Sequence, residues 1–220
     1  MRHLIKLTVI YILLFLAFTP DIVFPVGLGF YLSPFNSGNA TVDWDDIYIE
    51  KDDWPMTYWG FGFVFDTRIA KRGLFNYRLN LGYEHVKYTE ESDVGYISDS
   101  YFRIKLDNTF GFGILQSRLI RLWTGPQLRL AFENFPGNYN NFVNDGYAFG
   151  AGIAAVLGIN IHLNNFTSFS FDLGYRINGY TGAGASGSGF SAEYDKDASI
   201  SEQELFFNLY FIFRIRDSFN

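Results

Sequence analysis

The sequence contains no cysteine, and it has only three histidines among its 220 residues. Without cysteine the chain cannot form a disulfide framework or a zinc–thiolate site, and it offers no thiol for a lipid anchor. The net charge of −6 argues against nucleic acid as a partner, because nucleic-acid-binding domains carry basic surfaces. We therefore expect no cofactor, no metal centre and no nucleic-acid partner.

Long apolar runs are also missing, apart from one near the N-terminus. There Arg2, His3 and Lys6 precede an apolar stretch over residues 7–18, which Pro20 and Asp21 end. This stretch is short for a membrane span and has the layout of a secretory signal peptide. We predict a signal peptide over residues 1–24, with cleavage somewhere between Ala17 and Pro25, and one domain over 25–220. An uncleaved anchor helix is the alternative.

Aromatic residues and glycine are abundant instead. The chain has 25 Phe, 15 Tyr and 22 Gly, and aromatic residues make up 20% of it. This composition suits a protein whose exterior faces lipid and carries aromatic girdles at both membrane interfaces.

Apolar and polar residues alternate strictly near the C-terminus, where Leu205, Phe207, Leu209, Phe211, Phe213 and Ile215 occupy every second position. Successive side chains of a strand point to opposite faces, so this pattern predicts a strand with one apolar face. The pattern recurs along the chain and predicts eight strands, over residues 26–32, 58–68, 75–88, 101–112, 121–133, 147–162, 168–180 and 200–216. Segments of about ten residues with this period indicate an all-β, eight-stranded antiparallel transmembrane β-barrel.

The connections between these strands alternate in length. Short connections join the second strand to the third, the fourth to the fifth and the sixth to the seventh, whereas the other four are longer. Small outer-membrane barrels have short periplasmic turns and long extracellular loops, which predicts an up-and-down meander with both termini on the periplasmic side. A soluble lipocalin-like barrel is the structural alternative, but it would carry its apolar residues inside.

Three stretches, residues 125–132 (GPQLRLAF), 149–163 (FGAGIAAVLGINIHL) and 169–177 (FSFDLGYRI), carry a resemblance. The chain resembles the superfamily of small outer-membrane β-barrels that includes OmpA-transmembrane-like, OmpX-like, OmpW-like and opacity-type proteins. The resemblance implies the outer membrane of a diderm bacterium, with outer-membrane lipid and the barrel-insertion machinery as partners. It departs from the usual pattern at the C-terminus, where Phe219 is penultimate. We expect no wall-binding domain after the last strand.

Charged residues occupy the phase that should face the lumen, and the two signs are balanced. An eight-stranded barrel is just wide enough for its side chains to fill, and buried charges must be paired. The pattern therefore predicts a salt-bridged plug, whereas a narrow polar conduit for ions or small solutes is the alternative. The predicted lumen network comprises Asp66, Arg78, Glu84, Arg103, Lys105, Asp107, Arg129, Glu133, Asp172, Arg176, Glu204 and Arg214.

The predicted loops are the second candidate site. Aromatic and acidic residues gather there, and exposed aromatic residues often anchor partners. The predicted recognition residues for an extracellular ligand are Trp44, Asp45, Asp46, Asp52, Asp53 and Tyr139. Clustered carboxylates can also bind Ca²⁺ or Mg²⁺, but the spacing of an EF-hand is missing.

Enzymatic residues are scarce. His85 lies on the outward phase, and His162 lies at a short turn, where we expect it to be solvated or interfacial. Neither is followed two residues later by the serine expected of an outer-membrane lipid A deacylase, and hydrolysis needs a nucleophile beside a base. We therefore predict a structural or surface-interaction barrel that is not an enzyme; a narrow channel is the alternative, and a lipid-modifying enzyme comes third.

Overall fold

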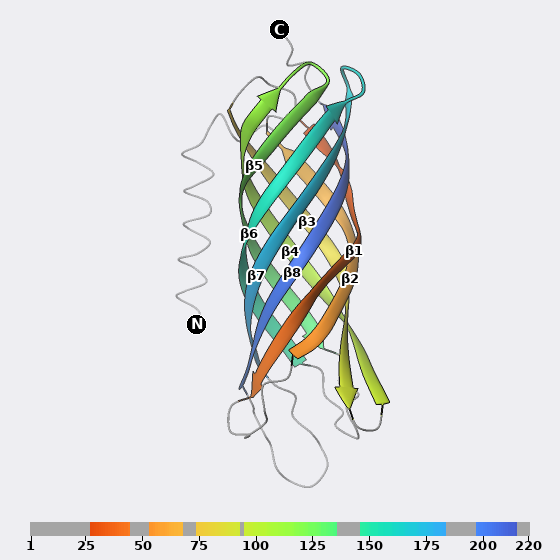
Figure 1. Ribbon diagram of the computed structural model, residues 1–220, viewed down its shortest axis with the longest axis vertical. Helices are drawn as coiled ribbons and strands as arrows, with labels where there is room; N and C mark the ends of the chain where they lie inside the picture. The colour runs from red at the N-terminus through yellow and green to blue at the C-terminus, as the bar shows by residue number, and fades with distance from the viewer. Residues whose placement is uncertain are drawn as a thin grey trace.

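Eight antiparallel strands close into one barrel in the computed structural model, which describes residues 27–44, 53–67, 74–92, 95–135, 146–183 and 197–214 (Figure 1). The strands follow one another in chain order, and the first pairs with the last, as predicted for an up-and-down meander. They are β1 (Gly27–Trp44), β2 (Asp53–Asp66), β3 (Phe75–Ser92), β4 (Gly95–Gln116), β5 (Ile120–Phe135), β6 (Gly146–His162), β7 (Thr167–Ala183) and β8 (Asp197–Arg214).

The first strand is much longer than predicted. β1 runs on to Trp44, past a bulge between Ser33 and Asn36 that shifts its register against β2. Pro34 lies within the bulge and has no N–H to donate to a ladder. After the bulge the inward positions change from odd to even numbers, so a search for strict alternation stops at Leu32.

One predicted long loop is instead a hairpin. β3 and β4 stay paired as far as Ser92 and Gly95, so that only residues 93–94 separate them. The prediction of a loop over residues 89–100 was wrong, because backbone pairing continues past the point where the outward side chains stop being apolar. This hairpin extends at the lower end of the barrel in Figure 1.

The short connections lie together at the opposite end of the barrel, at the top of Figure 1, where β1 begins and β8 ends. We call this the short-turn end; its connections are residues 67–74, 117–119 and 163–166. The other end is the loop end. In outer-membrane barrels the short turns are periplasmic and the longer loops are extracellular.

The strands are strongly tilted. Following paired residues once round the barrel from Gly27 leads back to β1 at Gly38, eleven positions further on. Such a stagger is what tilts the strands of a closed barrel. The intermediate partners are Asp66, Arg78, Thr109, Gln127, Ala154, Arg176 and Glu204.

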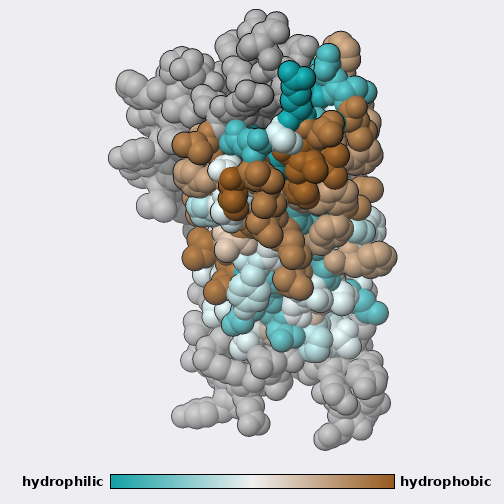
Figure 2. Space-filling view, turned by 45° about the horizontal axis from the view of Figure 1, so that its top comes forward, coloured by the Kyte–Doolittle hydropathy of each residue, from teal (hydrophilic) through white to brown (hydrophobic). Residues whose placement is uncertain are grey.

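Large apolar side chains cover the outside of the barrel in a band, which we call the belt. On the face that Figure 2 shows, hydrophobic side chains gather across the middle of the barrel, with hydrophilic ones towards both ends. A soluble domain does not expose so continuous an apolar surface, whereas a membrane-spanning barrel needs an apolar band about 25 Å tall. Its exposed members include Phe30, Trp59, Phe61, Phe63, Leu81, Ile104, Leu128, Ile153, Leu157, Leu173, Ile177 and Phe213.

Several strands continue past the belt at the loop end. We call this part the extension; it comprises residues 37–44, 53–58, 86–92, 95–101, 179–183 and 197–203. Its described outward side chains are mostly polar, as at Ser37, Thr57, Lys87, Thr181 and Gln203, all of which are exposed. Its inward side chains are mostly apolar and buried, and they include Ala40, Met56, Tyr58, Val86, Tyr88, Tyr180 and Ile200.

No helix among the described residues is long and apolar enough to cross a membrane. The predicted signal peptide lies outside the described residues.

Candidate functional site

The barrel lumen holds fourteen buried charged side chains among the described residues, and their signs balance. Seven are cationic, namely Arg78, Arg103, Lys105, Arg121, Arg129, Arg176 and Arg214. Seven are anionic, namely Asp66, Glu84, Asp107, Glu133, Asp172, Glu202 and Glu204. The list contains all twelve predicted lumen residues together with Arg121 and Glu202. Both additions share the inward phase of their strands with predicted residues, so phase alone could have identified them.

The cluster nearest the short-turn end is built around Arg78 on β3. Its Nε donates to Asp66 Oδ2 at 2.9 Å, and its Nη1 donates to Asp172 Oδ1 at 2.9 Å and Oδ2 at 3.0 Å. The guanidinium carbon lies 5.0 Å from the ring centroid of Trp123 and 4.5 Å from that of Tyr210. Two carboxylates and two rings therefore hold this arginine from opposite sides of the barrel.

A second cluster fills the middle of the lumen. Arg129 on β5 makes two hydrogen bonds to Asp107, at 2.7 and 3.1 Å, and two to Glu84, both at 3.1 Å. Lys105 reaches Glu84 at 2.5 Å and Asp107 at 3.2 Å. Arg176 forms an ion pair with Glu204. Such bidentate, charge-assisted bonds have the geometry that makes buried ion pairs tolerable.

The loop-side margin of the network depends on Arg103 on β4. Its guanidinium contacts Glu133, and it lies 2.6 Å from Glu202 and 3.3 Å from Glu84. Its carbon lies 5.1 Å from the ring centroid of Tyr180. Glu84 and Arg103 are register partners on the neighbouring strands β3 and β4.

Aromatic side chains close the lumen beyond Arg103. Tyr58, Tyr88 and Tyr180 are buried there beside Met56 and the other apolar residues of the extension. The hydroxyl of Tyr88 donates to Glu202, so this layer is joined to the adjoining charge network.

Glycines make space for the largest lumen side chains. A Cβ at Gly82 would overlap the Tyr31 side chain, and a Cβ at Gly158 would overlap the ring of Trp123. Both rings are buried inside the barrel. The glycines on the inward phase therefore reflect a crowded lumen.

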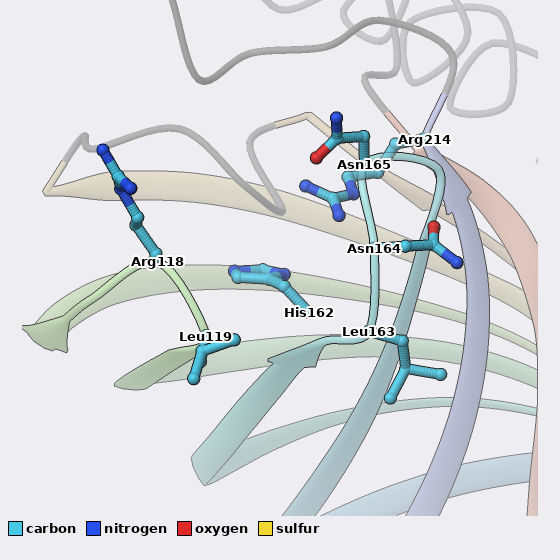
Figure 3. Close-up of a pocket in the computed structure, with 7 residues that line it drawn as sticks. All are labelled: Arg118, Leu119, His162, Leu163, Asn164, Asn165 and Arg214. Atoms are coloured by element: carbon cyan, nitrogen blue, oxygen red, sulfur yellow. The ribbon is translucent and has the colours of Figure 1, made fainter.

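His162 is buried, with only 5% of its surface exposed, so the prediction of a solvated or interfacial histidine was wrong. It lies at the last inward position of β6, where its Nδ1 is 2.9 Å from the Oγ of Ser168. A cavity of about 360 Å³ opens beside it at the short-turn end (Figure 3). Ser168 is fully buried and is not among the residues that line this cavity, so the pair does not present a nucleophile to it. His85, in contrast, packs on the outer face with its ring 5.6 Å from that of Trp59.

Two of the predicted loop residues belong to strands. Trp44 is the last residue of β1, and Asp53 is the first of β2. The other four, Asp45, Asp46, Asp52 and Tyr139, lie outside the described residues. Within the described ranges no group of three or more acidic, histidine or cysteine side chains could hold a metal ion.

Comparisons with known proteins give likenesses in structure only. No model of a protein family matches the chain, and neither does any curated protein. The outer membrane protein OprG from Pseudomonas aeruginosa is similar over 84% of this chain and 96% of its own, at 12% identity and a TM-score of 0.49. Neisserial surface protein A is similar over 82% and 95%, at 10% identity and a TM-score of 0.38. The attachment invasion locus protein Ail of Yersinia pestis is similar over 84% and 99%, at 8% identity and a TM-score of 0.29.

Identities this low bear on the fold alone. The chain's own features carry the assignment: a closed barrel without edges, an apolar belt on its outside and a charged interior. Only helices and closed barrels can satisfy every backbone polar group inside a bilayer. The protein is an eight-stranded antiparallel β-barrel with the outer surface of a membrane-spanning protein.

Proposed function

We propose that this outer-membrane barrel does not conduct and instead acts as a rigid scaffold that presents its loop end as an interaction surface. The observation that supports this is the filled lumen, in which fourteen buried charges of zero net charge adjoin a layer of buried tyrosines at the loop end.

Ion passage would have to disrupt several pairs at once. Arg129 alone contacts Glu84, Asp107 and Glu204 across the barrel, and Arg103 contacts four carboxylates. Removing one partner of a buried pair costs about 3–5 kcal/mol because it leaves an uncompensated charge. A conducting pore, in contrast, needs polar groups that exchange their contacts with the ion freely.

The extension supports a role for the loop end. Its polar outer face continues the barrel past the belt, so the ends of β1, β2, β7 and β8 stand away from the membrane surface. A rigid scaffold that carries variable loops is a common way to position binding residues. We propose Trp44, Asp45, Asp46, Asp52, Asp53 and Tyr139 as the recognition residues of this surface.

Single-channel recording in a planar bilayer tests the closed lumen. We expect the refolded protein, shown to be folded by a heat-dependent gel shift, to give no reproducible current steps. Defined steps whose reversal potential changes on reversing the charge of Arg103 and Lys105 would establish a narrow channel instead.

Deleting residues 45–52 tests the loop end. The barrel should still show its gel shift, because β1 and β2 already pair as far as Thr41 and Asp53. Binding to surface partners of the intact protein should be lost. A deletion variant that folds and binds as well as the intact chain would remove this loop from the proposal.

A further inference from the structure

The cavity at the short-turn end has a lining of one sign. Arg118 comes from the turn after β4, and Arg214 is the last residue of β8; Figure 3 shows them on either side of His162. Asn164 and Asn165 from the turn after β6 add amide groups, and Leu119 and Leu163 complete the lining. None of the described residues that line this cavity is a carboxylate, whereas the adjoining lumen holds charges of both signs.

The walls of the cavity are held in place before any ligand arrives. The Ser117 hydroxyl accepts the backbone N–H of Ile120 at 2.9 Å, which fixes the turn that carries Arg118. The Asn164 Oδ1 accepts the N–H groups of Phe166 and Thr167 at 2.7 and 2.8 Å, which fixes the other turn. The two turns are also joined, because the His162 N–H donates to the Leu119 carbonyl at 2.7 Å.

The end of β8 is hydrogen-bonded to the turn after β6, which also lines the cavity. The backbone N–H of Arg214 donates to the carbonyl of Phe166 at 2.7 Å. The cationic groups therefore sit on a rigid frame of three strand ends, and pre-organised groups bind with a smaller loss of conformational entropy.

Apolar side chains beside the cavity point to the kind of ligand. Leu119 is 66% exposed, Leu163 is 55% exposed and Phe166 is 70% exposed, and all three lie at the short-turn edge of the belt. Cationic groups next to lipid-facing side chains match a molecule with an anionic head and acyl chains. Guanidinium groups suit phosphate in particular, because they present several donors to its oxygens.

We propose that this cavity binds the phosphate of a phospholipid headgroup from the periplasmic leaflet, with Arg118 and Arg214 contacting the phosphate and Leu119 and Leu163 contacting the chains. Arg118 is the best residue to test, because it is exposed in a turn and forms no ion pair within the described ranges. The proposal goes beyond the proposed function, which concerns the closed lumen and the opposite end, although Arg214 is also one of the fourteen buried charges.

Lipid retention measured by native mass spectrometry tests the site. The full-length protein is refolded in a non-ionic detergent and titrated with short-chain phosphatidylglycerol. We expect one tightly retained lipid, and we expect Arg118→Glu to weaken its binding by about tenfold. The matched control is Lys87→Glu, which reverses an exposed cation at the other end of the barrel and should leave retention unchanged. A heat-dependent gel shift confirms that each variant is folded.

Two further probes distinguish the sources of the interaction. A short-chain diacylglycerol lacks the phosphate and should bind at least tenfold more weakly than phosphatidylglycerol, and inorganic phosphate should not displace the lipid. Displacement by inorganic phosphate would reassign the cavity to a free anion. Equal binding of diacylglycerol, or equal retention by wild type and Arg118→Glu, would overturn the site.

Discussion

The belt region and the extension are built from the same eight-stranded barrel with opposite polarity. Within the belt the outside is apolar and the inside is mostly polar and charged, whereas in the extension the outside is polar and the inside is mostly apolar. β3 shows both: Leu81 faces outward and Arg78 inward in the belt, and further along Lys87 faces outward and Val86 inward. The same strands form both regions, so we attribute the difference in side-chain polarity to the surroundings, which are lipid around the belt and water around the extension.

The difference teaches where the stability of each region comes from. In water, burying Val86 and Met56 is favourable because apolar surface leaves the solvent. In lipid the outward residues gain no such advantage from moving inward, and the lumen can be filled with paired charges instead. The inward residues change from mostly polar and charged to mostly apolar near the loop-side edge of the belt.

The largest expected loss of stability follows from removing Arg103, at the loop-side margin of the charge network. Arg103→Met leaves Glu133 and Glu202 without their shared cation, and we expect the free energy of unfolding to fall by about 3–5 kcal/mol. Urea unfolding of the refolded protein in lipid vesicles measures it. Lys87→Met removes an exposed cation from the paired strand and should change the value by less than about 0.5 kcal/mol. Similar losses for both variants would mean that the network contributes no more than surface charge.

A charge placed on the outer face should lower the free energy of unfolding much more in the belt than in the extension. Leu173 and Thr181 both face outward on β7, the first in the belt and the second in the extension. Leu173→Arg should destabilise the barrel by about 2–4 kcal/mol, the cost of an arginine near the bilayer midplane. Thr181→Arg should cost about 0–1 kcal/mol, measured in the same vesicles. Equal costs would place the membrane boundary elsewhere.

The smallest effect concerns the apolar interior of the extension. Val86→Ala removes two methyl groups from a fully buried position, and we expect a loss of about 1–2 kcal/mol. Lys87→Ala, the adjacent outward position, is the matched control, and its effect should stay within about 0.5 kcal/mol. A neutral Val86→Ala would show that the extension is not packed as a core.

The sequence predicted the belt better than the extension. Alternation gave the outward phase correctly wherever lipid-facing residues follow one another, as along β7 and β8. It failed at Pro34, where a bulge changes the phase, and beyond Tyr88, where the apolar residues move to the inward phase. The proline of the bulge and the change of apolar phase can both be read in the sequence. Period-two alternation alone, however, does not say which face is inside once the surroundings change from lipid to water.

The lumen residues could be listed from their phase, but their partners could not. Glu84 and Arg103 are neighbours in one hairpin, so a symmetric hairpin was enough to pair them. Arg78 with Asp172, and Arg103 with Glu202, meet across the barrel from distant strands. Their contacts depend on the closure of β1 on β8 and on the stagger of the strands, which no local pattern encodes.

The sequence by itself determined the number of strands, their order and the face that each presents to lipid, because these depend on local alternation and on the spacing of the turns. Only the tertiary structure decided which charges neutralise one another, that the extension carries an apolar core, and that Arg118, His162 and Arg214 meet at one cavity. These features arise when a tilted sheet closes, since closure brings together strand ends that are far apart in the chain.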